Sequence, residues 1–148
     1  MNDRTTLAAY ENDVVAWATE QARLLRERRF DALDIENIAE EIEDVGKAEK
    51  RELASRMSIL LMHLMKWQAQ PDRRGSSWLR TIAVQRREIA KHLAKMPSLK
   101  LLLSDPEWLE TVWGDALVHA MRETGLDDFP QDCPWPFDDV LADGWLPH

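Results

Sequence analysis

The sequence predicts an all-α fold, in which about four long helices form an up-and-down bundle and an ordered, irregular C-terminal segment follows. Glycine and proline residues gather near 71–75, 97, 125–136 and 144–147, and the stretches between them repeat apolar residues with helical period. No segment alternates apolar and polar residues cleanly, as a half-buried strand does. Amphipathic helices joined by short links favour an antiparallel bundle.

The size and composition indicate one helical domain over 1–148. The 148 residues are 45% hydrophobic and 31% charged, which excludes a disordered tail, a collagen-like repeat and a membrane bundle. We expect the bundle over about 1–125 and a C-terminal segment, rich in proline and tryptophan, over 126–148. Cys133 is the one cysteine, which excludes an intrachain disulfide. Because no stretch reads as an export signal or a membrane span, we expect a cytoplasmic protein.

Two helices are expected in the first half of the chain. Asp13 is placed to cap a helix over about 14–29, in which apolar residues recur on one face. Asp34 is placed to cap a much longer helix over about 35–69. Gly46 lies inside this second helix, and the sequence leaves open whether the glycine kinks or divides it.

Two further long helices are expected in the second half. Ser76 or Ser77 is placed to cap one of them, which runs to about Met96. The other begins after Asp105, which a proline and an acid follow, and it ends before Gly125, a residue suited to a helix C-cap.

The C-terminal segment carries aromatic residues between its prolines, so we expect it to pack on the bundle rather than to stay in solvent. Trp108, Trp135 and Trp145 are candidates for anchors of an interface with another chain. The alternative is that the segment caps the bundle.

One face of the helix over 35–69 is apolar, and three ionisable residues interrupt it. Glu49, Arg56 and His63 fall in the middle of this face at intervals of seven residues. The apolar residues that we expect to be buried on this face are Ile38, Ile42, Val45, Leu53, Leu60, Leu64 and Trp67.

Arg86 interrupts the apolar face of the next helix in the same way. A charge at such a position must be paired or reach water, because a stranded buried charge costs several kcal/mol. Glu52 lies one turn before Arg56, so the two side chains can pair. We therefore predict a polar cluster between the second and third helices, formed by Glu49, Glu52, Arg56, His63, Gln85 and Arg86.

Two interpretations of this predicted polar cluster stay open. The first is an ion-pair network between helices that fixes their register, which is the best-attested role of buried polar groups. The second is a pocket in which carboxylate, imidazole and guanidinium groups converge to bind an anion or to move protons.

The net charge of −8 is unevenly distributed. Residues 47–100 hold 13 basic and 4 acidic residues, whereas 31–45 and 123–148 each hold seven acids and no Lys or Arg. One interpretation is that acidic ends pack near a basic middle. The other is a cationic face for a polyanion, which the overall acidity and the scarcity of nearby exposed aromatics for base stacking disfavour. The residues of this candidate basic face are Arg73, Arg74, Arg80, Arg87, Lys91 and Lys95.

No catalytic or metal-binding signature is present in the sequence. A nucleophile elbow, a phosphate loop and a dinucleotide fingerprint are all missing. The pairs Glu88/His92 and Asp115/His119 each place two potential ligands on one helix face, but nothing supplies an obvious third ligand. We therefore expect surface ion pairs, no metal and no cofactor.

Several long motifs resemble those of one bacterial family. In chain order they are ENIAEEIEDVGKAEKRE (36–52), LLMHLMKWQAQP (60–71), RRGSSWLRTIAVQRREI (73–89), MPSL (96–99) and DCPW (132–135). From about Tyr10 to Leu146 the chain is similar to domain of unknown function 29. The resemblance implies an all-helical, bundle-like fold in a stand-alone bacterial protein, and it implies no activity, cofactor or binding residue.

We predict a non-enzymatic interaction or regulatory module, which self-associates or binds a protein partner. Seven tryptophans, segregated charge and the lack of a reaction signature favour this class. The alternative is a small-anion or metal-dependent enzyme that uses the predicted polar cluster. The third class is nucleic-acid binding through the candidate basic face, and no membrane partner is expected.

Overall fold

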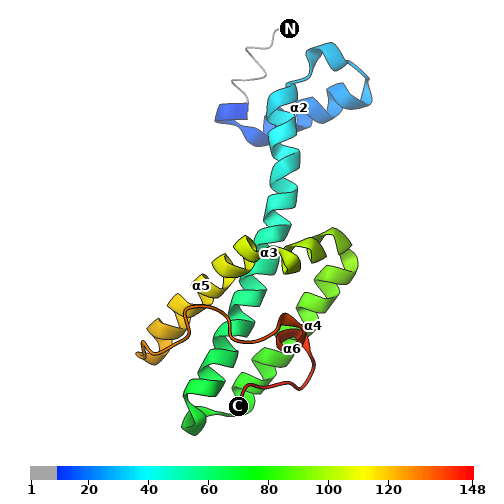
Figure 1. The fold of residues 1–148 in the computed structure, drawn as a ribbon. Helices are drawn as coiled ribbons and strands as arrows, with labels where there is room; N and C mark the ends of the chain where they lie inside the picture. The colour runs from blue at the N-terminus through cyan, green and yellow to red at the C-terminus, as the bar shows by residue number, and fades with distance from the viewer. Residues whose placement is uncertain (1–9) are drawn as a thin grey trace. The chain divides into compact units, whose positions relative to one another are not determined.

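The computed structural model describes residues 10–148, and every regular element in this range is helical (Figure 1). The elements are α2 (Val14–Arg26), the 3₁₀ turn η1 (Phe30–Ala32), α3 (Ile35–Ala69), η2 (Pro71–Arg73), α4 (Ser76–Lys95), η3 (Pro97–Ser104), α5 (Pro106–Thr124) and α6 (Phe137–Leu141). The predicted all-α class is confirmed, whereas four helices in one up-and-down bundle stay a prediction. None of the described helices combines the length and apolarity needed to cross a membrane. The cytoplasmic location stays a prediction.

The chain divides into two compact units, Met1–Glu49 and Lys50–His148. The helix α3 contributes its first part to the first unit and its second part to the second unit. Contacts between residues are concentrated within each unit. The expected single domain over 1–148 stays a prediction.

In the first unit, hydrogen bonds that converge on Asp34 hold α2 against the start of α3. The Asp34 carboxylate accepts from the Trp17 indole at 2.9 Å and from the Asn37 side-chain amide at 2.7 Å. The backbone N–H of Asp34 donates to the Gln21 side chain at 2.8 Å, and both Trp17 and Gln21 are buried. Asp34 therefore joins two helices as well as standing at the start of α3.

Tyr10 makes a second contact between the chain before α2 and α3. Its hydroxyl donates to Glu41 Oε1 at 3.0 Å, and its ring lies edge-on to Trp17 with 4.7 Å between the ring centroids. This hydrogen bond to a carboxylate raises the pKa of Tyr10 to about 12. Both contacts fix one side of α3 against α2.

Part of the apolar face that we expected to be buried on α3 is open to solvent. Leu53 is fully buried, as are Leu60 and Leu64, but Ile42 and Val45 are 67% and 68% exposed. The prediction is therefore wrong at Ile42 and Val45. Glu41, which Tyr10 contacts, lies about 100° around the helix from Ile42, so this contact does not cover Ile42.

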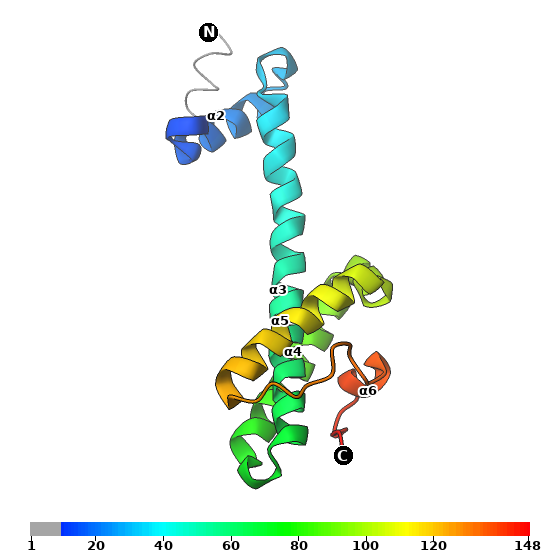
Figure 2. The same cartoon turned by 60° about the vertical axis from the view of Figure 1, so that its left-hand side comes forward.

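The core of the second unit forms where the second part of α3 meets α4 and α5 (Figures 1 and 2). Burial of each large aliphatic side chain contributes roughly 1.5–3 kcal/mol relative to its exposure. The buried core residues are Leu53, Met57, Leu60, Leu61, Leu64 and Met65 of α3, Ile82, Ile89 and Leu93 of α4, and Val112, Trp113, Ala116 and Ala120 of α5.

The end of α2 and the start of α4 differ from the predicted boundaries. α2 ends at Arg26, three residues before the predicted end, and Arg28 adopts a left-handed φ of 59° in the turn that follows. α3 runs unbroken through Gly46, which settles the question that the sequence left open. The predicted serine cap of α4 is wrong, because Ser76 is already its first helical residue and Gly75 before it makes no side-chain cap.

Both ends of α5 form as predicted. The Asp105 carboxylate accepts from the backbone N–H groups of Glu107 and Trp108 at 3.0 and 3.5 Å. Gly125 follows the last turn with φ 72°, a conformation that lets the backbone close the helix without a Cβ clash.

The C-terminal segment packs on the second unit, as predicted. After α5 it runs back across this unit to α6 (Figures 1 and 2), where Val140 is fully buried. The rings of Trp113, Trp135 and Trp145 form successive edge-to-face pairs, with centroids 5.7 and 5.8 Å apart. The Trp113 indole also donates to the Pro130 carbonyl at 3.1 Å. This packing favours the alternative in which the segment caps the bundle.

Candidate functional site

Glu52, Arg56 and Gln85, which belong to the predicted polar cluster, meet between α3 and α4. Arg56 Nη2 lies 3.3 Å from Glu52 Oε1, which is the predicted ion pair, and Arg56 Nη1 donates to Gln85 Oε1 at 3.5 Å. The Arg56 and Glu52 side chains are 30% and 49% exposed. A pair this open to water contributes at most about 1 kcal/mol to stability.

His92 joins this group, although sequence reasoning did not place it there. Its Nε2 lies 3.8 Å from Glu52 Oε2, and its side chain is largely buried. His92 follows Gln85 by seven residues, so both side chains lie on the same face of α4. That spacing is the signal in the sequence that could have found it.

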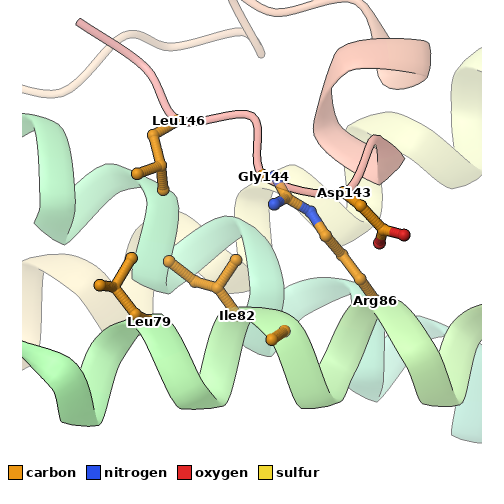
Figure 3. Close-up of a pocket in the computed structure, with 7 residues that line it drawn as sticks. Leu79, Ile82, Arg86, Asp143, Gly144 and Leu146 are labelled. Atoms are coloured by element: carbon orange, nitrogen blue, oxygen red, sulfur yellow. The ribbon is translucent and has the colours of Figure 1, made fainter.

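Arg86 points away from this group and toward the C-terminal segment. Its Nε donates to the Val140 carbonyl at 2.9 Å and its Nη2 donates to the Trp145 carbonyl at 2.7 Å. Figure 3 shows the guanidinium directed at the segment around Gly144. Burial lowers the pKa of the Arg86 guanidinium, while the charge of Asp143 acts in the opposite sense. The buried charge is thus stabilised by backbone carbonyls of an irregular segment rather than by the predicted cluster.

A small cavity of about 210 Å³ opens beside Arg86. Its lining is mostly aliphatic, and its volume lies below the range of pockets for drug-sized ligands, which begins at about 300 Å³. The residues around it are Leu79, Ile82, Ala83, Arg86, Asp143, Gly144 and Leu146 (Figure 3).

His63 lies apart from Glu52, Arg56 and Gln85, whereas a carboxylate oxygen of Glu49 lies within 4.8 Å of one of Glu52. His63 Nδ1 lies 2.9 Å from the Ile59 carbonyl and donates to it in the tautomer that carries the proton on Nδ1. Burial lowers the pKa of the His63 imidazole. Because His63 follows Arg56 by seven residues, it is displaced about 10.5 Å along the helix axis. Glu49 is half-buried and ends the first unit.

The candidate basic face lies on the exposed side of α4 and on the loop before it. Glu88 partly neutralises it, with its Oε1 3.7 Å from Arg87 Nε and 3.8 Å from Lys91 Nζ. Arg74 donates to the Trp67 carbonyl at 2.6 Å and stacks on that ring. All six predicted members are exposed, namely Arg73, Arg74, Arg80, Arg87, Lys91 and Lys95.

A larger groove of about 540 Å³ lies between α3 and α5. Asp115 and His119, which form one of the candidate ligand pairs, line it together with Glu123 and Arg51. Glu123 accepts from Lys66 at 2.7 Å, and this hydrogen bond lowers the pKa of the Glu123 carboxyl. Because the groove combines carboxylates with a guanidinium, its lining favours no single ligand charge.

The first part of α3, which is the cyan stretch of this helix in Figure 1, carries a row of apolar residues that are mostly exposed. We call Ile35, Ile38, Ile42 and Val45 the α3 row. Their separations of three, four and three residues keep them within about 80° of the helix circumference. Ile35, Ile42 and Val45 are 62%, 67% and 68% exposed, and Ile38 is half-buried. β-Branched residues at this spacing are typical of the seam between two packed helices.

The residues that border the α3 row are mostly small. Ala39 and Gly46 lie beside its Ile35 edge, and Glu41, which contacts Tyr10, lies beside its Val45 edge. Glu36, Glu40 and Glu43 are exposed and lie about 120–180° around the helix from the centre of the row, on the face away from it.

A comparison with family models matches residues 9–146 to the family described as Domain of unknown function DUF29. The chain belongs to this family. The match confirms the resemblance expected from the sequence, and it covers both the α3 row and the Glu52, Arg56 and Gln85 group of this DUF29 chain. Comparisons with curated proteins and with solved structures gave no match.

Proposed function

We propose that this DUF29 chain is a protein-interaction module and that its binding surface is the α3 row. The observation that carries the proposal is the exposure of Ile35, Ile42 and Val45 on one face of a long helix. Transfer of such side chains out of water stabilises a complex by roughly 1.5–3 kcal/mol each. A monomer scatters its exposed apolar residues, whereas this row is contiguous.

The surroundings of the α3 row support this function. Protein interfaces combine an apolar centre with a polar rim. The aliphatic side chains of the row provide the centre, and Glu41 provides a polar group at its edge. The exposed face of a regular helix also binds without reorganisation of its backbone, which lowers the entropic cost of association.

The other predicted classes receive less support from the geometry. The enzyme alternative needs converging groups, but Arg86 donates to the carbonyls of Val140 and Trp145, while Glu52 and Arg56 form an exposed pair. The nucleic-acid alternative needs cations free to meet phosphates, but Glu88 lies close to two members of the candidate basic face.

Native mass spectrometry of the full chain, purified gently from its own source, tests the proposal. The variant Ile42→Ser removes the centre of the α3 row. Its matched control is Leu101→Ser in η3, because Leu101 is also a large apolar residue and is 77% exposed. Both substitutions are at the surface and leave the fold intact.

We expect the parent chain and Leu101→Ser to appear as a complex heavier than the 17.2 kDa of one chain, and Ile42→Ser to appear alone. A parent chain that appears only at its own mass would contradict the proposal. So would a complex that survives Ile42→Ser unchanged.

A further inference from the structure

We infer that the cavity beside Arg86 binds a small aliphatic α-amino acid. The carboxylate of this ligand pairs with the Arg86 guanidinium, its ammonium group faces Asp143, and its side chain lies against the aliphatic part of the lining. The site belongs to the second unit and shares no residue with the α3 row. The residues that form this site, which we call the Arg86 cavity, are Leu79, Ile82, Ala83, Arg86, Asp143, Gly144 and Leu146.

The volume of the Arg86 cavity limits the size of its ligand. The cavity measures about 210 Å³, whereas a protein cavity of about 150 Å³ is large enough to hold benzene. In proportion, the Arg86 cavity has room for a molecule of about eight non-hydrogen atoms. Valine is of this size, whereas a nucleotide, a sugar phosphate or a dipeptide is too large.

One side of the Arg86 cavity is apolar. In Figure 3, Leu79, Ile82 and Leu146 lie to one side of the guanidinium, and the Asp143 carboxylate lies to the other. Leu79 is 43% exposed, so part of its apolar surface is open to water. A branched aliphatic side chain placed against it removes apolar surface from water on both molecules, which favours binding.

The Arg86 guanidinium is the group that binds the carboxylate of the ligand. Arg86 is 5% exposed, and its Nε and Nη2 donate to the carbonyls of Val140 and Trp145. Among the residues that the structure describes, none accepts a hydrogen bond from Nη1 and no carboxylate forms an ion pair with Arg86. Burial lowers the pKa of this guanidinium, so an anion bound beside it stabilises its charged form.

Asp143 favours a zwitterion over a simple carboxylate. Its exposed side chain lines the same cavity, and its charge acts to raise the pKa of Arg86, although the two described side chains form no direct ion pair. A simple carboxylate bound at Arg86 is repelled by Asp143, whereas the ammonium group of an α-amino acid is attracted to it. One small molecule with both charges therefore satisfies both side chains.

Other small ligands match only part of this lining. Inorganic phosphate has no apolar group to place against Leu79 and Ile82. An alkylamine is attracted to Asp143, but it leaves the buried Arg86 without a counter-charge. An aliphatic amino acid matches the apolar side and both charges.

Isothermal titration calorimetry of the full chain with L-valine tests the inference. Two analogues of nearly the same size each change one charged group: L-valinamide lacks the carboxylate, and the α-hydroxy analogue of valine lacks the ammonium group. We expect valine to bind with a Kd on the order of 0.1 mM and both analogues to bind at least about tenfold more weakly. Valine that binds no more tightly than either analogue, or that gives no binding at about 10 mM, would overturn the inference.

Two variants test the role of Asp143 without changing Arg86. Asp143→Asn removes the charge in the cavity, whereas Asp138→Asn makes the same change on an exposed acid of the same segment that does not line the cavity. We expect Asp143→Asn to weaken valine binding about fivefold without weakening that of the α-hydroxy analogue. Asp138→Asn weakens valine binding less than about twofold. Equal effects of the two variants on valine would overturn the pairing of its ammonium group with Asp143.

A second pair of variants tests the apolar side of the cavity. Leu79 and Leu101 are 43% and 77% exposed, so serine at either position leaves the fold intact. We expect Leu79→Ser to weaken valine binding about fivefold and Leu101→Ser to leave it unchanged. Binding that Leu79→Ser does not weaken would place valine outside the Arg86 cavity and overturn the inference. The mass of the native complex is a separate measurement, so this site and the α3 row succeed or fail independently.

Discussion

At the scale of single residues, the buried Arg86 joins α4 to the C-terminal segment. The residue is 5% exposed, and its guanidinium donates to two backbone carbonyls of the C-terminal segment. A hydrogen bond from a charged donor contributes more than one between neutral groups, and its loss leaves the buried acceptor without a partner. Arg86 therefore fastens α6 and the residues after it to α4.

The substitution Arg86→Met tests this role. It preserves much of the aliphatic stem and removes both donors, so we expect the free energy of unfolding to fall by about 2–4 kcal/mol. Chemical denaturation measures the change. Arg87→Met on the next, exposed residue is the control and changes stability by less than about 0.5 kcal/mol. Equal effects of the two substitutions would show that Arg86 does not hold the segment.

His63 predicts a pH dependence of stability. Burial lowers the pKa of its imidazole in the folded chain below the unfolded value of 6.5, so the unfolded chain takes up the proton first as the pH falls. The contribution of His63 is complete above pH 6.5 and is lost as the pH falls below it. Between about pH 7.5 and 5.5, we expect the parent chain to lose more stability than His63→Gln does.

This window lies above the range in which the neighbouring Glu123 titrates, because its hydrogen bond with Lys66 lowers the pKa of that carboxyl from 4.5. Denaturation curves of the two proteins at several pH values measure the difference. Parallel dependence on pH in the parent and in His63→Gln would contradict the assignment to His63.

Sequence reasoning at this scale succeeded where partners lie on one helix. The Glu52 and Arg56 pair is an i,i+4 contact that follows from helical geometry alone. The destination of Arg86 depends on where a segment 54 residues later in the chain crosses α4, and no local pattern encodes that. His63 was grouped with Arg56 because the two residues lie on the same face of α3. Seven residues separate them, so the two side chains start about 10.5 Å apart along the helix axis and do not meet.

At the scale of elements, the helices could be predicted because their boundaries are local. α5 is the clearest example, since Asp105 and Gly125 act on the turns adjacent to them. The burial of an apolar face is not local in this sense. Periodicity indicates that one face of a helix is apolar, but it does not show whether another part of the same chain covers that face. For this reason the predicted burial of Leu53 is confirmed, whereas the predicted burial of Ile42 is wrong.

Two glycines, one inside α5 and one that follows its last turn, provide a matched test of this local control. Gly125 has φ 72°, which disfavours a side chain, whereas Gly114 lies inside the helix and an added Cβ there meets no atom within 4 Å. We expect Gly125→Ala to destabilise the chain by about 1 kcal/mol and Gly114→Ala to stabilise it by about 0.5–1 kcal/mol. Thermal or chemical denaturation gives both values. Stabilisation by Gly125→Ala would contradict the left-handed cap.

At the scale of the whole molecule, the two acidic blocks of the chain have different surroundings. In the block over 123–148, Glu123 accepts a hydrogen bond from Lys66. The carbonyls of Val140 and Trp145 accept from Arg86, so basic residues from the middle of the sequence donate to this block. In the block over 31–45, the described hydrogen bonds of the carboxylates come from Tyr10, Trp17 and Asn37. The apolar α3 row within this block remains exposed, and this exposure is the basis of the proposed function.

Site-specific photo-crosslinking in cells of the source organism tests that function most directly. A photoreactive residue at position 42 lies in the α3 row, and one at position 44 lies on the other side of the same helix turn. We predict a discrete crosslinked product from position 42, in which mass spectrometry identifies a second polypeptide, and a much lower yield from position 44. Equal yields from the two positions, or no product from position 42, would contradict the assignment of the α3 row as a binding surface.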